Sequence, residues 1–246
     1  ITTASESIPE GLTILGSGTA DAATFDAALT LDNDDITLEG LRFNVGSGNA
    51  GVTITGNNAN IKDSVFVGPD SGGPAGTGID IDSGSATITG STFNGLESGA
   101  VVDTAAAQTV SLTGNTITNN ATGVEVEGFP ADAATSLSIA ENNFSGNATN
   151  AINLTGTFAD QAADFKIESN RIDLADSSTG IASSAAIPAA YDPTLGRRII
   201  DNAYSLPTGE NESATRFALT GKYGEANLIV VDDATTDLPN SRSGAN

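Results

Sequence analysis

Residues 78–82 read Gly-Ile-Asp-Ile-Asp, and residues 85–93 read Ser-Ala-Thr-Ile-Thr-Gly-Ser-Thr-Phe. Ile79 and Ile81 are two positions apart, which places both side chains on one face of an extended strand. The second run alternates in the same way and ends on the bulky Phe93. The stretch therefore predicts one repeat unit, made of a short strand, a turn and a second strand that a bulky residue ends.

The second half of this unit recurs along the chain with few exceptions. It consists of an aliphatic residue, two spacers, Asn or Ser, one spacer, and an aromatic residue or Ile. The copies cover residues 38–43, 61–66, 88–93, 112–117, 139–144, 167–172 and 199–204. Their last residues follow one another at steps between 23 positions (from 43 to 66) and 32 positions (from 172 to 204). A nearly constant unit with insertions of variable length is typical of a solenoid.

The first half of the unit recurs in phase with the second as a pair of apolar residues two positions apart. The pairs are Leu29 and Leu31, Val52 and Ile54, Ile79 and Ile81, Ala100 and Val102, Val124 and Val126, Ile152 and Leu154, and Phe217 and Leu219. No segment sustains the apolar spacing of three and four that a helix requires. Strands this short bury their apolar face only by stacking on their neighbours. We therefore expect an all-β, single-domain, right-handed parallel β-helix of about eight coils.

Two columns of residues support this architecture. The bulky position (residues 43, 66, 93, 117, 144 and 172) predicts an internal stack of large apolar groups about 4.8 Å apart. The position two residues earlier reads Leu41, Ser64, Ser91, Asn115, Asn142, Asn170 and Asn202. A run of Asn in successive coils predicts a ladder of hydrogen-bonded amides, or Asn residues that serve only turn chemistry. Both interpretations place a bend of the chain there.

The repeat also sets the expected organisation. Residues 1–26 form an N-terminal entry whose irregular first strand covers the open end of the coil, residues 27–231 form the β-helix, and residues 232–246 form a polar tail. A long loop interrupts the pattern at about residues 182–198. Insertions at 68–77, 127–135 and 155–163 would build one face if they leave the coil at related corners.

Composition narrows the possible partners. The 9 basic and 31 acidic residues give a formal charge of −22, which makes nucleic acid and anionic membranes poor partners. No apolar run reaches the length of a membrane span. The acidic, lysine-poor composition suits a surface bathed in salt or divalent cations and suggests a marine or halophilic source. The chain has no Cys, so it has no disulfide framework.

The quoted strands resemble the coils of the pectin-lyase-like superfamily, over roughly residues 11 to 230 and at the level of the repeat pattern. That superfamily includes pectate lyases, polygalacturonases, phage tailspikes and surface adhesins, so the resemblance implies the fold and either a polysaccharide-directed or an adhesive role. Polygalacturonases carry Asn-Thr-Asp-Gly-x-Asp where residues 76–80 read Gly-Thr-Gly-Ile-Asp, and an Asp pair where Glu97 and Ser98 stand. Their Gly-His-Gly segment has no counterpart in a chain without His.

Acidic residues are the candidate site. Asp80 and Asp82 share the outward face of one strand, about 6.8 Å apart, and Asp82, Asp103 and Glu127 take similar outward positions in successive coils, about 4.8 Å apart. Carboxylates at such distances can hydrolyse glycosidic bonds, or can bind calcium, which is the candidate cofactor. Solvated acidic surface is the simpler interpretation.

The loop at 182–198 is the second candidate. Tyr191 and the basic pair Arg197 and Arg198 would form a binding loop, or the loop covers the core near the C-terminal end. Five Asn-x-Ser/Thr sequences, at Asn120, Asn143, Asn147, Asn153 and Asn211, match glycosylation acceptors. A chain this rich in Asn, Ser and Thr produces several such matches by chance, so no function is assigned to them.

The sequence therefore favours a non-enzymatic structural protein, extracellular or on a cell or virion surface, as part of a filament, sheath, adhesin or spike. Its expected partners are copies of itself or other surface proteins, with glycans as a further possibility, through the coil ends and the insertion loops. The alternative is a tailspike-like or pectinase-like protein that binds or cleaves polysaccharide with its acidic outer stripe.

Overall fold

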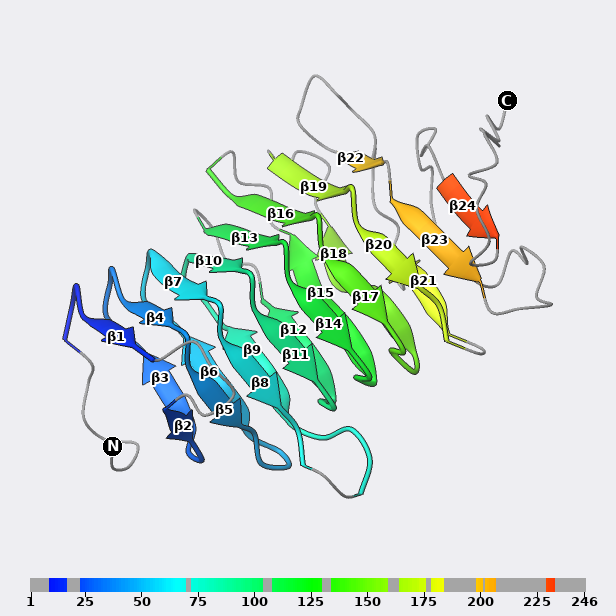
Figure 1. The fold of residues 1–246 in the computed structure, drawn as a ribbon. Helices are drawn as coiled ribbons and strands as arrows, with labels where there is room; N and C mark the ends of the chain where they lie inside the picture. Colours follow the sequence, from blue (N-terminus) through cyan, green and yellow to red (C-terminus); the bar gives the residue numbers. More distant parts are fainter. Residues whose placement is uncertain are drawn as a thin grey trace.

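The computed structural model describes residues 9–16, 23–69, 72–103, 108–129, 134–158, 164–175, 178–183, 198–200, 202–206 and 229–232. These residues form three parallel sheets that wind around one core (Figure 1). Sheet A contains β1 (Thr13–Leu15), β4 (Thr37–Glu39), β7 (Ala59–Lys62), β10 (Ala86–Thr89), β13 (Thr109–Thr113), β16 (Ser136–Ala140), β19 (Asp164–Glu168) and β22 (Arg198–Ile200). Sheet B contains β2 (Thr24–Phe25), β5 (Arg42–Asn44), β8 (Val65–Val67), β11 (Thr92–Asn94), β14 (Thr116–Thr118), β17 (Asn143–Ser145), β20 (Arg171–Asp173), β23 (Ala203–Leu206) and β24 (Ile229–Asp232). Sheet C contains β3 (Leu29–Leu31), β6 (Ala50–Ile54), β9 (Thr77–Ile81), β12 (Ser98–Val102), β15 (Thr122–Phe129), β18 (Asn150–Phe158) and β21 (Thr179–Ser183).

The chain visits the three sheets in a fixed order, and each visit adds a strand beside the one laid down a turn earlier. Among the described residues, seven consecutive turns contribute to all three sheets, from β1–β3 to β19–β21. A further turn contributes β22 and β23, and β24 pairs with β23. The predicted all-β parallel solenoid is thus confirmed. The sequence predicted about eight coils, and the described residues form seven complete turns and part of another.

Each turn has three strands, where the sequence predicted two. The expected second strand is broken at the Asn or Ser position, because the residue just before it adopts a left-handed conformation. In the unit of residues 85–93 this residue is Gly90, with φ of 60°, and its equivalents are Gly40, Asp63, Gly114, Glu141 and Ser169. The bulky residue consequently lies inside a short strand of sheet B and does not end a longer one.

The interior consists of the apolar columns that the sequence predicted. Most inward pairs of sheet C, such as Ile79 and Ile81, have no exposed area. In sheet B, the rings of Phe43 and Phe66 stack with centroids 4.8 Å apart and planes 5° apart, and Phe66 and Phe93 stack at 4.9 Å. The column continues in register through Ile117, Phe144, Ile172 and Tyr204. The predicted internal stack is confirmed.

A glycine column, which sequence reasoning missed, faces this stack from sheet C. A Cβ on Gly78 would lie 2.7 Å from Cδ1 of Phe93, and one on Gly123 would lie 2.8 Å from Cδ1 of Phe144. The carbonyl oxygens of Gly99 and Ala151 lie closer still to these two Cβ positions, so the backbone of the next turn and the large rings together require the absence of a side chain. The members of the column are Gly51, Gly78, Gly99, Gly123 and Gly180.

The amide ladder is present at the bend between sheets A and B. Nδ2 of Asn115 donates to Oδ1 of Asn142 at 3.0 Å, and Nδ2 of Asn142 donates to Oδ1 of Asn170 at 3.0 Å. Asn170 continues the ladder to Asn202 at 2.9 Å. Each of these amides also serves backbone groups: Oδ1 of Asn142 accepts from the backbone N–H of Asn115 at 2.9 Å. Towards the N-terminal end serines replace the asparagines: Oγ of Ser91 accepts from the backbone N–H of Ser64, and Oγ of Ser64 accepts from the backbone N–H of Leu41.

A second ladder occupies the bend between sheets B and C. Nδ2 of Asn120 donates to Oδ1 of Asn147 at 3.2 Å, and Oδ1 of Asn120 accepts from the backbone N–H of Leu96 at 2.9 Å. Asn120 and Asn147 are 0% and 3% exposed. The sequence had these two asparagines only as glycosylation acceptors; their burial leaves no room for a glycan in the folded protein. Among the other acceptors, Asn143 is exposed, Asn153 is half-buried and Asn211 lies outside the described residues.

The predicted segments map onto the structure as follows. β1 and β2, from the expected entry at 1–26, already pair with β4 and β5. The insertions at 127–135 and 155–163 both lie where the chain passes from sheet C to sheet A, and each begins inside a strand, because β15 and β18 extend to Phe129 and Phe158. The insertion at 68–77 lies at another corner, between β8 and β9. The condition for a single face, that all three insertions leave the coil at related corners, is therefore not met; two of them share a corner.

The ladder predicts a large difference between two adjacent asparagines. Asn142→Ala removes an amide that bonds Asn115, Asn170 and the carbonyl of Leu112, and leaves buried polar groups without partners. We expect it to lower the free energy of unfolding by about 2–4 kcal/mol. Asn143→Ala removes an exposed side chain from the outer face of sheet B and should change it by less than about 0.5 kcal/mol. Chemical denaturation of both variants measures this; equal losses would contradict the role of the ladder.

The bend gives a second prediction. Glu141 is exposed with φ of 57°, a conformation that a side chain disfavours, and Gly114 takes the same place one turn earlier. Glu141→Gly should raise the free energy of unfolding by about 0.5–1 kcal/mol, because the relief of strain exceeds the extra entropy of an unfolded glycine. Ala140→Gly, inside β16, is the control and should lower stability. Thermal unfolding of both variants distinguishes them, and a destabilised Glu141→Gly would refute the assignment of strain.

Candidate functional site

The outer face of sheet C carries the predicted acidic residues. Asp80, the last residue but one of β9, points outward, opposite Thr53 on one side and Val101 on the other. Val101 in turn lies opposite Glu125 of β15. Because inward and outward positions alternate along a strand, the buried Ile79 and Ile81 fix Asp80 on the outside.

The other three residues follow the same register. The backbone N–H of Asp103 donates to the carbonyl of Ile81 at 2.9 Å, which places Asp103 beside Asp82, the residue after Ile81. Val102 pairs with Val126, so Glu127 lies at the corresponding position one turn further on. Asp82, Asp103 and Glu127 therefore occupy successive turns, as the sequence predicted.

Two further carboxylates join this group. The pKa of Glu125 is raised, first by burial and then by repulsion from Glu127 and Glu97, while a hydrogen bond from Asn153 opposes the shift. Glu125 was identifiable in the sequence as the outward residue between Val124 and Val126; Glu97 had no comparable signal. We call Asp80, Asp82, Glu97, Asp103, Glu125 and Glu127 the acidic face.

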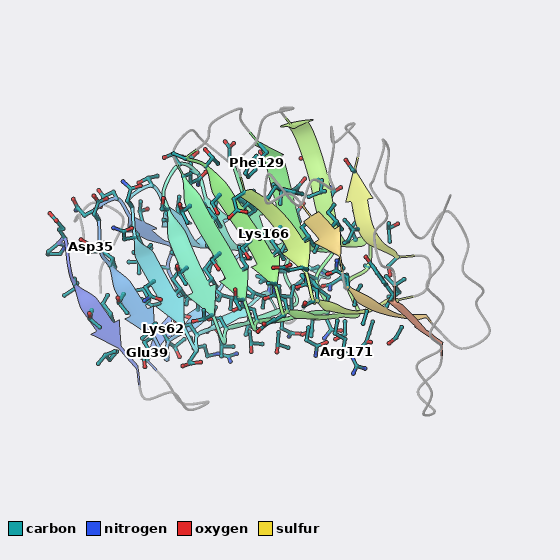
Figure 2. All side chains as sticks on the ribbon, turned by 90° about the horizontal axis from the view of Figure 1, so that it is seen from above. Asp35, Glu39, Lys62, Phe129, Lys166 and Arg171 are labelled. Carbon is teal, nitrogen blue, oxygen red and sulfur yellow. The ribbon has the colours of Figure 1, made fainter. Side chains whose placement is uncertain are left out.

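Burial and mutual repulsion dominate the electrostatics of the acidic face. The pKa of Asp80 is raised, first by burial and then by the charges of Asp82, Glu127 and Asp103. The ion pairs found in the described residues lie elsewhere: Lys166 Nζ contacts Asp164 at 2.8 Å on sheet A, and Arg171 Nε contacts Asp173 at 3.2 Å on sheet B. Figure 2 shows Lys166 and Arg171 well apart from each other, on different sides of the coil. No described cation therefore offsets the charge of the acidic face.

The repeat, the three parallel sheets and the internal ladders describe one architecture, and a family comparison agrees with it. The family described as right-handed beta helix region matches residues 27–186, well over half of the chain. The chain belongs to the right-handed β-helix family. Comparisons with curated proteins and with solved structures returned no match. The family assignment gives this β-helix its fold and its handedness, and leaves its site to be argued from its own residues.

The acidic face does not form a ready-made metal site. In the described ranges, no three His, Cys, Asp or Glu side chains are placed to hold one ion. Calcium binding by Asp80, Asp82, Asp103 and Glu127 stays a prediction, and it would require these side chains to move or a second molecule to supply ligands.

The predicted binding loop lies largely outside the described residues. This applies to Tyr191 and Arg197. The backbone of Arg198 begins β22 and pairs with Lys166 of β19. No helix in the described part of the chain is long and apolar enough to cross a membrane.

The raised pKa of Asp80 predicts a pH-dependent stability. Because the folded state disfavours the charged carboxylate, Asp80 lowers the stability of the β-helix as pH rises from the unfolded pKa, near 3.8, through the raised folded pKa. Asp80→Asn should raise the melting temperature at neutral pH, and this gain should vanish below the unfolded pKa. Salt should reduce the gain by screening the neighbouring charges.

Asp173→Asn is the control, since this variant removes a carboxylate that is paired with Arg171. It should give no gain at neutral pH. Melting temperatures of both variants across the acid range test the assignment; a gain at Asp80 that persists at low pH would show that the cost of burying its charge among other carboxylates is not the cause.

Proposed function

We propose that this β-helix is a rigid, non-enzymatic structural module outside the cell or on a cell or virion surface. It serves there as part of a filament, sheath, adhesin or spike. The observation that supports the proposal is the continuity of its interior: the apolar stack continues in register from Phe43 to Tyr204, and the amide ladder links the turns from Asn115 to Asn202.

The interior favours stiffness for a physical reason. A buried amide such as Asn142 donates to one turn and accepts from another, so a local opening breaks hydrogen bonds on both sides. Buried networks of this kind strengthen their members and resist partial opening. Stiffness and resistance to proteases are what a load-bearing or surface-exposed rod requires.

The acidic exterior suits the same role. A formal charge of −22 keeps separate molecules apart at low ionic strength, and salt or divalent cations reduce that repulsion. Carboxylates of the acidic face that no described cation offsets can then share cations with another molecule. In this reading calcium bridges molecules, and the ions in the surroundings regulate assembly.

The alternative is a polysaccharide-directed protein. Glycosidases use two neighbouring carboxyl groups, one of which has a raised pKa, and the acidic face contains neighbouring carboxylates of which Asp80 has a raised pKa. Against it, the described outward positions around Asp80 are Thr53, Val101 and Glu125, and the described phenylalanines of the stack lie inside. Sugar sites usually present exposed aromatic platforms, so the surroundings of Asp80 favour the structural role. The net charge also disfavours acidic polysaccharides as ligands.

Electron microscopy of the purified chain in high salt tests the proposal, with calcium in one sample and a chelator in the other. We expect ordered fibres, lattices or other defined assemblies with calcium, and their loss on chelation would assign the carboxylates to bridging cations. Assemblies in both samples would support the structural role without calcium. Dispersed particles in both samples would contradict self-assembly, and would favour a glycan-binding or glycan-cleaving module.

A further inference from the structure

The end of β11, in the middle of sheet B, carries a reactive dipeptide. Asn94 is the last residue of β11 and is followed by Gly95, and the chain contains no other Asn-Gly sequence. The backbone nitrogen that follows an asparagine can attack Cγ of its side chain. Glycine hinders this attack least, because it has no Cβ. The sequence therefore marks Asn94 as the asparagine of this chain that is most prone to lose its side-chain amide.

The hydrogen bonds of Asn94 use its side chain as an acceptor. Oδ1 accepts from Nδ2 of Asn119 at 2.9 Å and from Oγ1 of Thr118 at 3.2 Å, and both donors belong to the next turn. Within the described ranges, no group accepts a hydrogen bond from Nδ2 of Asn94. The two donors are placed to stabilise the negative charge that collects on Oδ1 when a nucleophile adds to Cγ. The carbonyl is thus activated, and no described acceptor retains the amide nitrogen.

Asn44 occupies the equivalent position two turns earlier and is used differently. Its Nδ2 donates to Oδ1 of Asp26 at 2.8 Å, and its Oδ1 accepts from Nε of Arg42 at 3.1 Å. The next residue is the β-branched Val45, whose side chain hinders attack by its backbone nitrogen. Asn44 therefore needs its amide as a donor and has a poor nucleophile beside it, so it is a matched control.

The nucleophile of the dipeptide is held loosely. The backbone N–H of Gly95 donates to the carbonyl of Thr118 at 3.3 Å. The equivalent bonds in other turns are shorter, at 2.7, 2.9 and 3.0 Å for the N–H groups of Val45, Gly68 and Asn119. Gly95 is also half-buried, and its φ of 72° places it at the bend where the chain leaves sheet B. Its nitrogen is therefore released from the sheet more easily than its equivalents.

We propose that Asn94 and Gly95 form a site of spontaneous deamidation in the folded protein. The backbone nitrogen of Gly95 loses its proton and bonds to Cγ of Asn94, and the bond from Cγ to Nδ2 breaks as Nδ2 takes up a proton and leaves as ammonia. Water then opens the resulting cyclic succinimide at either of its carbonyl groups, which gives aspartate or isoaspartate. The net reaction consumes one water and replaces the amide by a carboxyl group. This inference does not rest on the proposed function.

The fold accommodates the aspartate product. A carboxylate at position 94 keeps the bonds from Thr118 and Asn119, and hydrogen bonds to a charged acceptor are stronger than those to a neutral one. Its outward neighbours in sheet B are Val67 and Thr118, which carry no charge to repel it. The protein would therefore gain a negative charge on sheet B without losing a hydrogen bond.

The isoaspartate product does not fit in the same way. It leads the backbone through the side-chain carbons and so lengthens a strand that is paired on both sides. It also removes the backbone carbonyl of Asn94 that accepts from the N–H of Gly68 at 2.9 Å. The pairing of β11 should therefore direct ring opening towards aspartate.

Peptide mapping by mass spectrometry tests the site, after the intact protein has been kept in a mildly alkaline buffer. Asn94 should convert at least about tenfold faster than Asn44. Thr118→Val keeps the shape of the side chain and removes one donor to Oδ1, so it should slow the conversion about two- to tenfold. Asn94→Gln should abolish the acidic form on ion exchange, because the longer side chain would have to close a larger ring.

Two further measurements test the fit of the product. Asn94→Asp should keep or exceed the melting temperature of the parent. Asn44→Asp should lower it, because this variant sets a second carboxylate beside Asp26. The fraction of isoaspartate at position 94 should be smaller when the folded protein reacts than when the chain reacts in denaturant.

Equal rates at Asn94 and Asn44, or conversion of Asn94 in denaturant alone, would overturn the site, because the fold would then protect the dipeptide. A rate that Thr118→Val leaves unchanged would refute activation by the hydroxyl group. A destabilised Asn94→Asp variant, or an isoaspartate fraction as large in the folded protein as in denaturant, would contradict the fit of the product.

Discussion

The bend before each short strand of sheet B is the constraint on which the rest of this β-helix depends. There the backbone turns through a left-handed residue, and the next side chain enters the interior. From Ser64 to Asn202 that side chain is polar and must find hydrogen-bond partners. An asparagine such as Asn142 meets this need by bonding the turns on both sides of it. The bond that satisfies the bend therefore also sets the register of the neighbouring turn. Register then fixes which side chains meet in the apolar stack and on the outer faces.

The apolar interior is the second consequence of that register. Once the turns stack in phase, the rings of Phe66 and Phe93 meet face to face at 4.9 Å, close to the natural spacing of parallel strands. The same rings reach across to sheet C, where only glycine leaves enough space, as Gly78 does for Phe93. A large ring in sheet B thus requires a residue without a side chain at the facing position of sheet C. A shift of one residue in any turn would break both the ladder and this complementarity.

The sequence predicted the features that follow from the regular spacing of residues along the chain. It missed the features that depend on how side chains from different turns fit together. Apolar pairs two apart, such as Ile79 and Ile81, identify strands and faces by themselves, and the spacing of Asn142 and Phe144 identifies the ladder and the stack. The bend at the Asn or Ser position was predicted, but the third sheet was missed: glycine marks the left-handed residue in only some turns, as at Gly90, and a residue such as Glu141 gives no sign of that conformation. The glycine column was missed because each glycine makes room for groups of another turn, and the residues of its own turn do not reveal them.

The residues of the candidate site likewise differ in how far the sequence predicted them. Asp80, Asp82, Asp103 and Glu127 were found from register, because outward positions repeat as regularly as inward ones. Glu97 joined them only in three dimensions, since it precedes its strand and has no fixed phase. The partial exposure of Phe25 was likewise beyond the sequence: the same residue type in the same phase is fully buried one turn later, at Phe43, and only its place at the end of the stack distinguishes it.

Interior and exterior respond to the surroundings in different ways. The ladders and the apolar stack are uncharged and buried, so dissolved ions screen nothing there. The acidic face lies on the outside of sheet C, where salt screens the repulsion among its carboxylates and so reduces what their charge costs the folded state. The proposed structural role would use this difference: ions would adjust contacts at the surface, while the buried ladders keep the register of each turn.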